Sequence, residues 1–194
     1  MGDKKIYNTL GASNHSDEDR AENDFYATPK RVTQMLLDKE KFNNNVLEPC
    51  CGIGHISEVL IENNYTVTSF DLIDRGYGEG NIDFFKYDKK FNGDIVTNPP
   101  YSQALKFLQH GLNLIDEGNK IAMFLRLQFF EGKSRYLFFK NNPPKVVYIS
   151  VNRISPEKNG VFVSDKHQGA VCFAWFVWKK GFKGETVIKY FNEK

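Results

Sequence analysis

A short apolar run, Asp94–Thr97, ends in Asn98-Pro99-Pro100-Tyr101, and this junction limits how the chain can fold. The run is typical of a short buried strand. Proline lacks the N–H that a sheet needs, fixes its own φ and restricts the residue before it, so the strand must end in a stiff corner. Such a corner holds the Asn98 carboxamide, the Pro99 carbonyl and the Tyr101 ring in fixed relative positions. Two acceptors beside a flat ring suit adenine, cytosine or a primary amide, although the same residues can also form a simple turn.

Strand and helix patterns alternate along most of the chain. Apolar runs predict strands at 46–47, 65–70, 82–87, 94–97 and 121–127, and helical spacing follows from about 55, at 102–115 and at 133–140. Alternation of this kind favours a parallel sheet with helices on both faces. Two further runs, 146–151 and 171–178, have no helical pattern between them, which predicts an antiparallel addition at the sheet edge. The predicted fold class is α/β.

Length and composition predict one folded domain over 23–194, after a flexible polar tail over 1–22. No stretch approaches the roughly 18 consecutive apolar residues of a membrane span, and the polar N-terminus has no signal segment. Two of the three cysteines are adjacent, which predicts reduced thiols in a cytoplasmic protein rather than disulfides. The four histidines show no ligand-like pairing with the cysteines, so no metal site is predicted.

The net charge of +2 is too small to indicate a nucleic-acid partner by itself. Between residues 120 and 145, however, Glu131 is the single acidic residue among basic ones: Lys120, Arg126, Lys133, Arg135, Lys140 and Lys145. This local bias suits contacts with phosphates, and it equally suits a solvated surface over a buried strand.

A glycine turn and two aspartates predict a cofactor site at the same sheet edge as Asn98. Gly52-x-Gly54 follows the first predicted strand, where glycine lets the backbone approach a ligand. The third position of a dinucleotide fingerprint is Ser57, which favours a cofactor without a pyrophosphate. Asp71 and Asp88 end the second and third predicted strands. A strand-end aspartate alone is more often a turn residue, but here several polar strand ends would meet at one edge.

The chain resembles the S-adenosylmethionine-dependent amino-methyltransferases, and most closely the small adenine-N6 DNA methyltransferases of phages and prophages. The resemblance covers roughly residues 22–191. It rests on these motifs, in order: Phe25-Tyr26-x-Thr28-Pro29, Glu48-Pro49-x-Cys51-Gly52-x-Gly54-His55, Asp71, Asp88, Asn98-Pro99-Pro100-Tyr101, Arg126-Leu127-x-Phe129-x-Glu131-Gly132 and Ala174-Trp175-Phe176-Val177-Trp178.

The resemblance implies a Rossmann-like class I methyltransferase fold. Its sheet is expected to be mostly parallel and seven-stranded, with an antiparallel C-terminal strand. S-adenosylmethionine would be held by Phe25, Tyr26, Thr28, Glu48, Pro49, Cys51, Gly52, Gly54, Asp71, Leu72 and Asp88. The catalytic residues would be Asn98, Pro99, Pro100 and Tyr101. The acceptor would contact Tyr101, Arg126, Arg153, Lys158 and Lys166.

The implied reaction is methylation of the adenine N6 amino group in DNA, where the base is first flipped out of the duplex. The chain has no room for a separate target-recognition region, so we expect relaxed sequence preference or help from a protein partner or a homodimer. Three alternatives stay open: methylation of an RNA adenine, methylation of a glutamine amide of a release factor, and a non-catalytic cofactor-binding protein. The early Phe25-Tyr26-x-Thr28-Pro29 motif favours the DNA methyltransferases over the RNA and release-factor enzymes.

Overall fold

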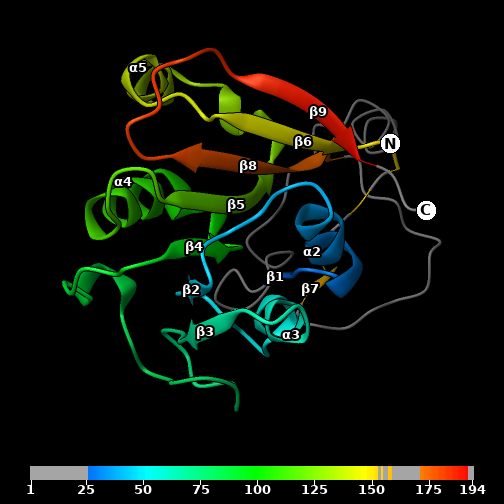
Figure 1. Cartoon of the computed structure of the whole chain (residues 1–194), viewed down its shortest axis with the longest axis vertical. Coiled ribbons are helices and arrows are strands. Elements are labelled where there is room, and N and C mark those ends of the chain that lie inside the picture. Colours follow the sequence, from blue (N-terminus) through cyan, green and yellow to red (C-terminus); the bar gives the residue numbers. More distant parts are fainter. Residues whose placement is uncertain (1–25, 153, 155–156, 159–170, 192–194) are drawn as a thin grey trace, which may run out of the picture.

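The computed structural model describes residues 26–152, 154, 157–158 and 171–191. Within them, a seven-stranded sheet forms the centre of the molecule and helices pack on both of its faces (Figure 1). The predicted N-terminal tail, 1–22, lies outside the described residues.

The strand order of the large sheet is β3-β2-β4-β5-β8-β6-β9. The strands are β2 (Asn45–Glu48), β3 (Thr66–Ser69), β4 (Asp94–Thr97), β5 (Lys120–Arg126), β6 (Val146–Ser150), β8 (Phe173–Lys179) and β9 (Val187–Phe191). All are parallel except β8, which runs antiparallel to β5 and β6. The mostly parallel seven-stranded sheet with an antiparallel C-terminal strand is therefore confirmed.

The sequence predicted the antiparallel strand at the edge of the sheet, and this position is wrong. β8 is inserted between β5 and β6, and its first six residues are all buried. The edge is instead β9, a strand that the sequence pattern did not indicate. Four of the five β9 residues are exposed, so its sequence lacks the apolar run that marks a buried strand.

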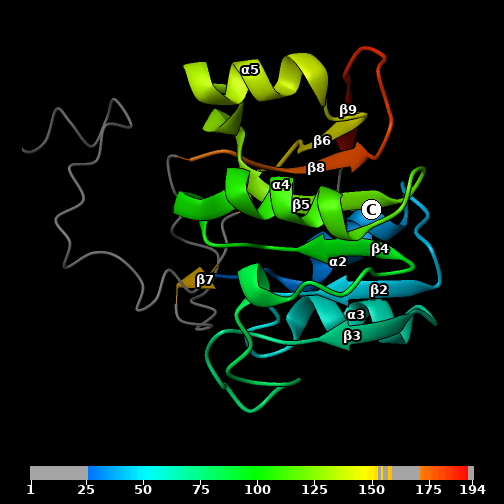
Figure 2. The same cartoon turned by 90° about the vertical axis from the view of Figure 1, so that its left-hand side faces the viewer.

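Helices cover both faces of the sheet, as predicted. α2 (Lys30–Leu37) and α3 (His55–Glu62) pack on one face, and α4 (Ala104–Leu114) and α5 (Lys133–Asn141) on the other (Figures 1 and 2). Successive side chains of a strand point to opposite faces, and β8 follows this rule: Trp175 packs beneath α2, and Phe176 packs against Phe130 on the opposite face. The Trp175 indole N–H donates to the Val32 carbonyl of α2 at 3.0 Å, which fixes that helix on the sheet.

The third predicted strand, 82–87, is absent, and a short 3-10 helix, η3 (Phe84–Lys86), stands in its place. The Asp83 carboxylate accepts a hydrogen bond from the Phe85 N–H at 2.9 Å, which begins the helical turn. The Phe84 ring is buried under α4, where it stacks on Phe107. The apolar residues of 82–87 therefore anchor a turn rather than a strand.

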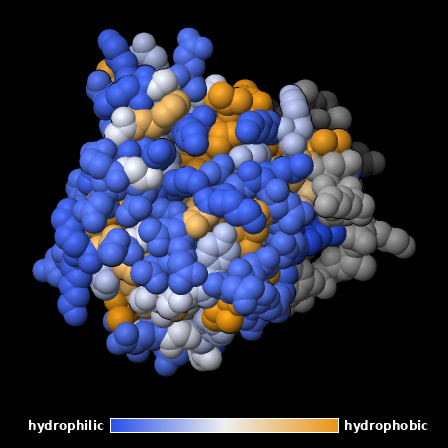
Figure 3. Space-filling view, viewed as in Figure 1, coloured by the Kyte–Doolittle hydropathy of each residue, from blue (hydrophilic) through white to orange (hydrophobic). Residues whose placement is uncertain are grey.

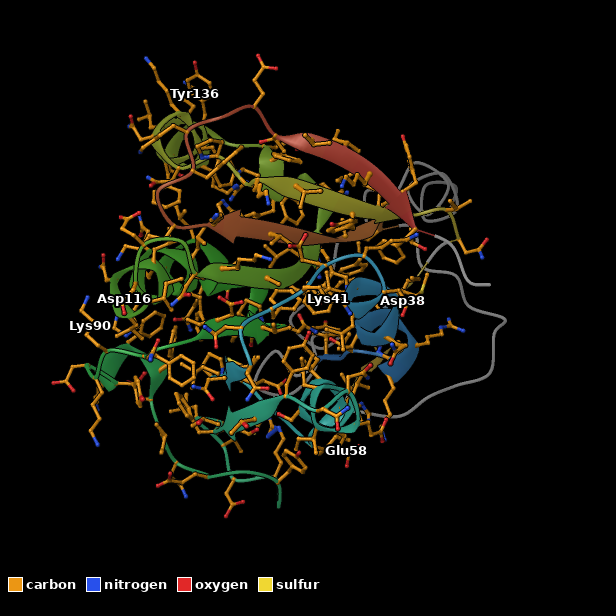
Figure 4. All side chains as sticks on the ribbon, viewed as in Figure 1. Asp38, Lys41, Glu58, Lys90, Asp116 and Tyr136 are labelled. Atoms are coloured by element: carbon orange, nitrogen blue, oxygen red, sulfur yellow. The ribbon has the colours of Figure 1, made fainter. Side chains whose placement is uncertain are left out.

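The face of the molecule seen in Figure 3 is largely hydrophilic, with scattered apolar patches. Tyr136 projects from α5 away from the sheet and is 65% exposed (Figure 4). Glu58 of α3, also labelled there, forms an ion pair with Lys30 of α2 at 2.6 Å. Within the part of the chain that the structure describes, no helix has the length and apolar character to cross a membrane.

Candidate active site

A cavity of about 580 Å³ lies at the carboxyl ends of β2, β3 and β4. Its volume falls within the range of small-molecule pockets, roughly 300–1,000 Å³. Residues that follow each of these strands line it, and the segment containing Tyr26 and Thr28 contributes to its wall. Ligands of open parallel sheets bind at this edge, because the strand ends place their loops there together.

Asn98 lines this cavity, and its amide is held in one orientation. The Asn98 Nδ2 donates to the Tyr26 carbonyl at 2.7 Å and to the Thr28 Oγ1 at 3.0 Å. The Asn98 Oδ1 is buried and has no hydrogen-bond partner among the described residues. A buried acceptor without a donor is costly, so this oxygen is suited to receive an N–H from a ligand.

The other members of the proline corner are placed differently. Pro100 lines the cavity, whereas Pro99 is buried and Tyr101 lies outside the cavity lining. The Tyr101 ring stacks on Tyr26 with centroids 5.6 Å apart and an interplanar angle of 30°. The Arg126 guanidinium lies 5.0 Å from the centroid of the Tyr101 ring. The sequence predicted the ring but not these neighbours, because they come from distant parts of the chain.

Asp71 joins the glycine turn to the end of β3. Its Oδ2 accepts from the Gly52 N–H at 2.9 Å and its Oδ1 from the Ile73 N–H at 3.0 Å. A carboxylate oxygen has two lone-pair sites, so each Asp71 oxygen keeps capacity for a second donor. Asp71 and Leu72 both line the cavity, and their role in binding a cofactor stays a prediction.

The two glycines shape this region without lining the cavity. Gly52 and Gly54 both have positive φ, 56° and 91°, which favours glycine. A side chain at Gly54 would meet the ring of Tyr77, because a Cβ built there lies 2.5 Å from two ring carbons. In the structure, Gly54 therefore makes room for Tyr77. Gly54 does not line the cavity, and its predicted role in leaving room for the cofactor stays a prediction.

Glu48 lies at the end of β2, is buried and lines the cavity together with Pro49 and Cys51. The Ser57 hydroxyl donates to the Glu48 carboxylate, and the Ser57 and Ser69 hydroxyl oxygens are 2.6 Å apart. Burial raises the pKa of the Glu48 carboxyl well above its usual range, and the Ser57 hydrogen bond opposes this effect. The sequence did not indicate Ser57 and Ser69 as partners of Glu48.

Burial also raises the pKa of the Cys51 thiol to about 12. A thiol with so high a pKa carries little thiolate at neutral pH and is a poor nucleophile. Cys51 is thus suited to filling the tight turn and not to covalent chemistry.

Asp88 is exposed and is not among the residues that line the cavity. The cavity is lined instead by Asp83, together with Phe84 and Phe85 of η3. The prediction placed Asp88 at the end of a strand, and that strand does not form. The aspartate brought to the cavity is consequently the one that begins η3.

Several predicted residues lie outside the described part of the chain, namely Phe25, Arg153 and Lys166. The backbone of Lys158 is described. β7 (Glu157–Lys158) pairs with β1 (Tyr26–Ala27) in a separate two-stranded antiparallel sheet, in which Lys158 lies opposite Tyr26. This pairing places the Lys158 backbone next to the residue whose carbonyl binds the Asn98 amide.

The cavity fits S-adenosylmethionine by the chemistry of its polar groups. Asp71 offers carboxylate lone pairs to ribose hydroxyls, and Asp83 beside two phenylalanine rings suits an adenine with its amino group. A ligand ammonium would favour the ionised form of Glu48, which burial alone disfavours. Across the described segments, no group of three or more His, Cys, Asp or Glu side chains is arranged to hold a metal ion.

No protein-family model and no curated protein sequence matches the chain. Solved structures nevertheless share its fold. A protein of Pyrococcus horikoshii assigned as an RNA methyltransferase superposes with a TM-score of 0.57 and 12% identity over 94% of this chain and 100% of its own. The M protein of the type I restriction enzyme EcoKI gives a TM-score of 0.54 and 13% identity over 81% of this chain and 44% of its own.

A Listeria monocytogenes protein assigned as a class I S-adenosylmethionine-dependent methyltransferase gives a TM-score of 0.51 and 12% identity, over 83% of this chain and 62% of its own. At these identities, the likeness establishes the fold. The fold is that of the class I S-adenosylmethionine-dependent methyltransferases. The chain spans less than two thirds of the Listeria protein and less than half of the EcoKI M protein.

Proposed function

We propose that this protein transfers the methyl group of S-adenosylmethionine to an exocyclic amino group, and that its acceptor is the N6 of adenine in DNA. The observation that carries this proposal is the Asn98 Oδ1. It is a buried acceptor without a partner in the described chain, at the end of β4 and in the wall of the cavity. An amino group is the donor that such an oxygen suits.

The cavity residues divide into two sets. Asp71, Asp83 and Glu48 offer acceptors on the β2 and β3 side, where the cofactor would bind. Asn98 and Pro100 line the β4 side, where the acceptor amino group would lie. With this division, the methyl donor and the amino group would lie together within one cavity, which is the proximity that group transfer needs.

The acceptor nitrogen is a weak nucleophile because its lone pair is delocalised into the aromatic ring. When bound, S-adenosylmethionine supplies a methyl group on a positively charged sulfur. A hydrogen bond from the amino group to the Asn98 Oδ1 favours a pyramidal nitrogen whose lone pair is available. The same oxygen stabilises the positive charge that develops on that nitrogen during transfer. The protein thus acts by positioning and electrostatics, without a covalent intermediate.

A nucleic-acid acceptor is favoured by Arg126. Its guanidinium covers the Tyr101 ring at 5.0 Å, and its Nε is buried without a hydrogen-bond partner within the described residues. A cation at the end of β5, beside the proline corner at the end of the neighbouring β4, suits the phosphate next to a flipped nucleotide. The names of two structural neighbours point the same way, one concerning RNA methylation and one concerning a DNA restriction system.

Target recognition would need more than the described chain. The EcoKI M protein is more than twice as long as the part that this chain matches. We therefore infer that sequence preference is short, or that a second copy or a partner protein contributes the contacts to bases.

Transfer of labelled methyl groups tests the proposal. The protein would be incubated with labelled S-adenosylmethionine and duplex DNA, single-stranded DNA, ribosomal RNA or release factor. We expect label in DNA, on adenine N6. Label only in RNA or in release factor would change the acceptor class, and cofactor binding without any transfer would favour a non-catalytic cofactor-binding protein.

Asn98→Ala tests the role of Asn98 in catalysis. We expect the methylation rate to fall by about 10²- to 10³-fold, the cost of removing one aligned charge-stabilising group from an active site. The affinity for the cofactor should stay within about twofold. Asn113→Ala is the matched control, because Asn113 is exposed on α4 and does not line the cavity. An Asn98→Ala variant with the activity of the control would refute the assignment.

A further inference from the structure

We propose that Thr28 is a positioning residue that fixes which end of the Asn98 amide faces the methyl acceptor. The inference rests on the proposed function, since it concerns the residue that would bind the acceptor amino group. It assigns to Thr28 a role other than the cofactor contact that the resemblance implies.

The hydrogen bonds of the Asn98 amide identify which of its two ends is the nitrogen. A backbone carbonyl only accepts hydrogen bonds, so the Asn98 atom 2.7 Å from the Tyr26 oxygen must be the nitrogen. The second Nδ2 proton is used by the Thr28 Oγ1 at 3.0 Å. Both protons of the amide nitrogen are therefore bound to the segment formed by β1 and Thr28, 70 or more residues away in sequence.

The orientation of the amide decides whether the site can work. With the nitrogen bound on one side, the Oδ1 occupies the other branch of the amide, where it is buried and without a partner among the described residues. A flipped amide would present N–H groups to the N–H groups of the acceptor, and it would bring the Oδ1 against the Tyr26 oxygen. Only the observed orientation can accept a hydrogen bond from an amino group.

Thr28 is well placed to hold this orientation. The residue is 3% exposed, so water competes little for its hydrogen bond. Its backbone is bounded by the β1–β7 pairing on one side and by the Val32 N–H to Pro29 carbonyl hydrogen bond on the other. The amide nitrogen binds two acceptors, the Tyr26 backbone carbonyl and the Thr28 hydroxyl. Only the Thr28 hydroxyl can be removed by a substitution, because it belongs to a side chain.

Thr28→Val tests the inference, with Thr28→Ser as the variant that keeps the hydroxyl. With cofactor and DNA saturating, we expect Thr28→Val to lower kcat roughly three- to tenfold, the factor that corresponds to one net hydrogen bond. The cofactor Kd should not change, and Thr28→Ser should restore most of the rate. Thr33→Val is the matched control, because the Thr33 side chain is equally buried in α2 and its Oγ1 has no hydrogen-bond partner among the described residues.

A second measurement does not depend on activity. The side-chain amide signals of Asn98 in a ¹⁵N-correlated NMR spectrum can be assigned by their loss in Asn98→Ala. We expect these signals to shift in Thr28→Val and to stay in place in Thr33→Val. Unchanged Asn98 signals in Thr28→Val would overturn the inference, as would a weaker cofactor Kd with an unchanged kcat, which would make Thr28 a cofactor contact.

The two measurements separate the two proposals. If the wild-type protein methylates none of the acceptors but the Asn98 signals shift in Thr28→Val, the proposed function fails and the positioning contact stands. If the wild-type protein methylates DNA and Thr28→Val matches Thr33→Val in both measurements, the positioning role fails and the proposed function stands.

Discussion

Replacing Gly54 with alanine should destabilise the protein for two separable reasons. Gly54 has a φ of +91°, where an L side chain costs about 1–2 kcal/mol. A Cβ at this position would also lie 2.5 Å from two carbons of the Tyr77 ring and 2.7 Å from Cγ, the ring carbon bonded to the Tyr77 Cβ. The whole ring must therefore move, and overpacking of this kind costs about 1–3 kcal/mol. The expected loss for Gly54→Ala is about 2–5 kcal/mol of unfolding free energy.

Gly118→Ala is the matched control for the backbone contribution. Gly118 has the same φ of +91°, and a Cβ there has no neighbour within 4 Å. Urea unfolding of Gly118→Ala should therefore show the backbone cost alone, about 1–2 kcal/mol. The difference between the two variants measures the contact with the Tyr77 ring.

Removing the ring provides the decisive comparison. In a Tyr77→Ala background, Gly54→Ala should cost only as much as Gly118→Ala, because the ring that the new Cβ would meet is gone. A double-mutant cycle of unfolding free energies gives this coupling directly. If Gly54→Ala costs the same with and without Tyr77, or no more than Gly118→Ala, the proposed packing of the ring over the turn is wrong.

Two further predictions concern the carboxylates of the cavity. Asp71→Asn should weaken cofactor binding about 10- to 100-fold, because it removes a charged acceptor, and it should affect kcat much less. Calorimetry measures the affinity for the cofactor. An unchanged Kd with a lower kcat would contradict the placement of Asp71. Glu48→Gln should stabilise the protein increasingly as pH rises above about 4.5, because a raised pKa means that the folded state holds its proton more tightly and that ionisation costs stability. Each unit by which the folded pKa exceeds the unfolded one corresponds to about 1.36 kcal/mol. Urea unfolding of both proteins across pH measures the difference, and parallel pH curves would show that Glu48 is not the buried acid described.

Local sequence patterns predicted the elements that present the site. Prolines that end β4 and glycines that follow β2 act within a few residues, because they restrict or relax φ at their own positions. Asn98 and Asp71 were placed at one edge of the sheet by the same reasoning, since each follows its own parallel strand. The cavity is lined by both of them.

The sequence patterns gave wrong predictions where the apolar residues of a segment belong to another kind of element, or where a strand has no apolar run. The run at 82–87 packs the Phe84 ring under α4 as part of a turn, so Asp83 rather than Asp88 lines the cavity. β9 was missed because an exposed edge strand needs no apolar run. In both cases the deciding factor is which neighbour the side chains meet, and periodicity does not contain that information.

The sequence by itself determined the class of fold, the stiff corner at Asn98 and the glycine turn, because these depend on backbone restrictions of adjacent residues. Only the tertiary structure decided how the corner is used. It brought Tyr26 and Thr28 to the Asn98 amide and left the Asn98 oxygen as the buried acceptor, and it placed Tyr77 over Gly54. These contacts join residues far apart in the chain, and their geometry exists only once the sheet and its covering helices have packed.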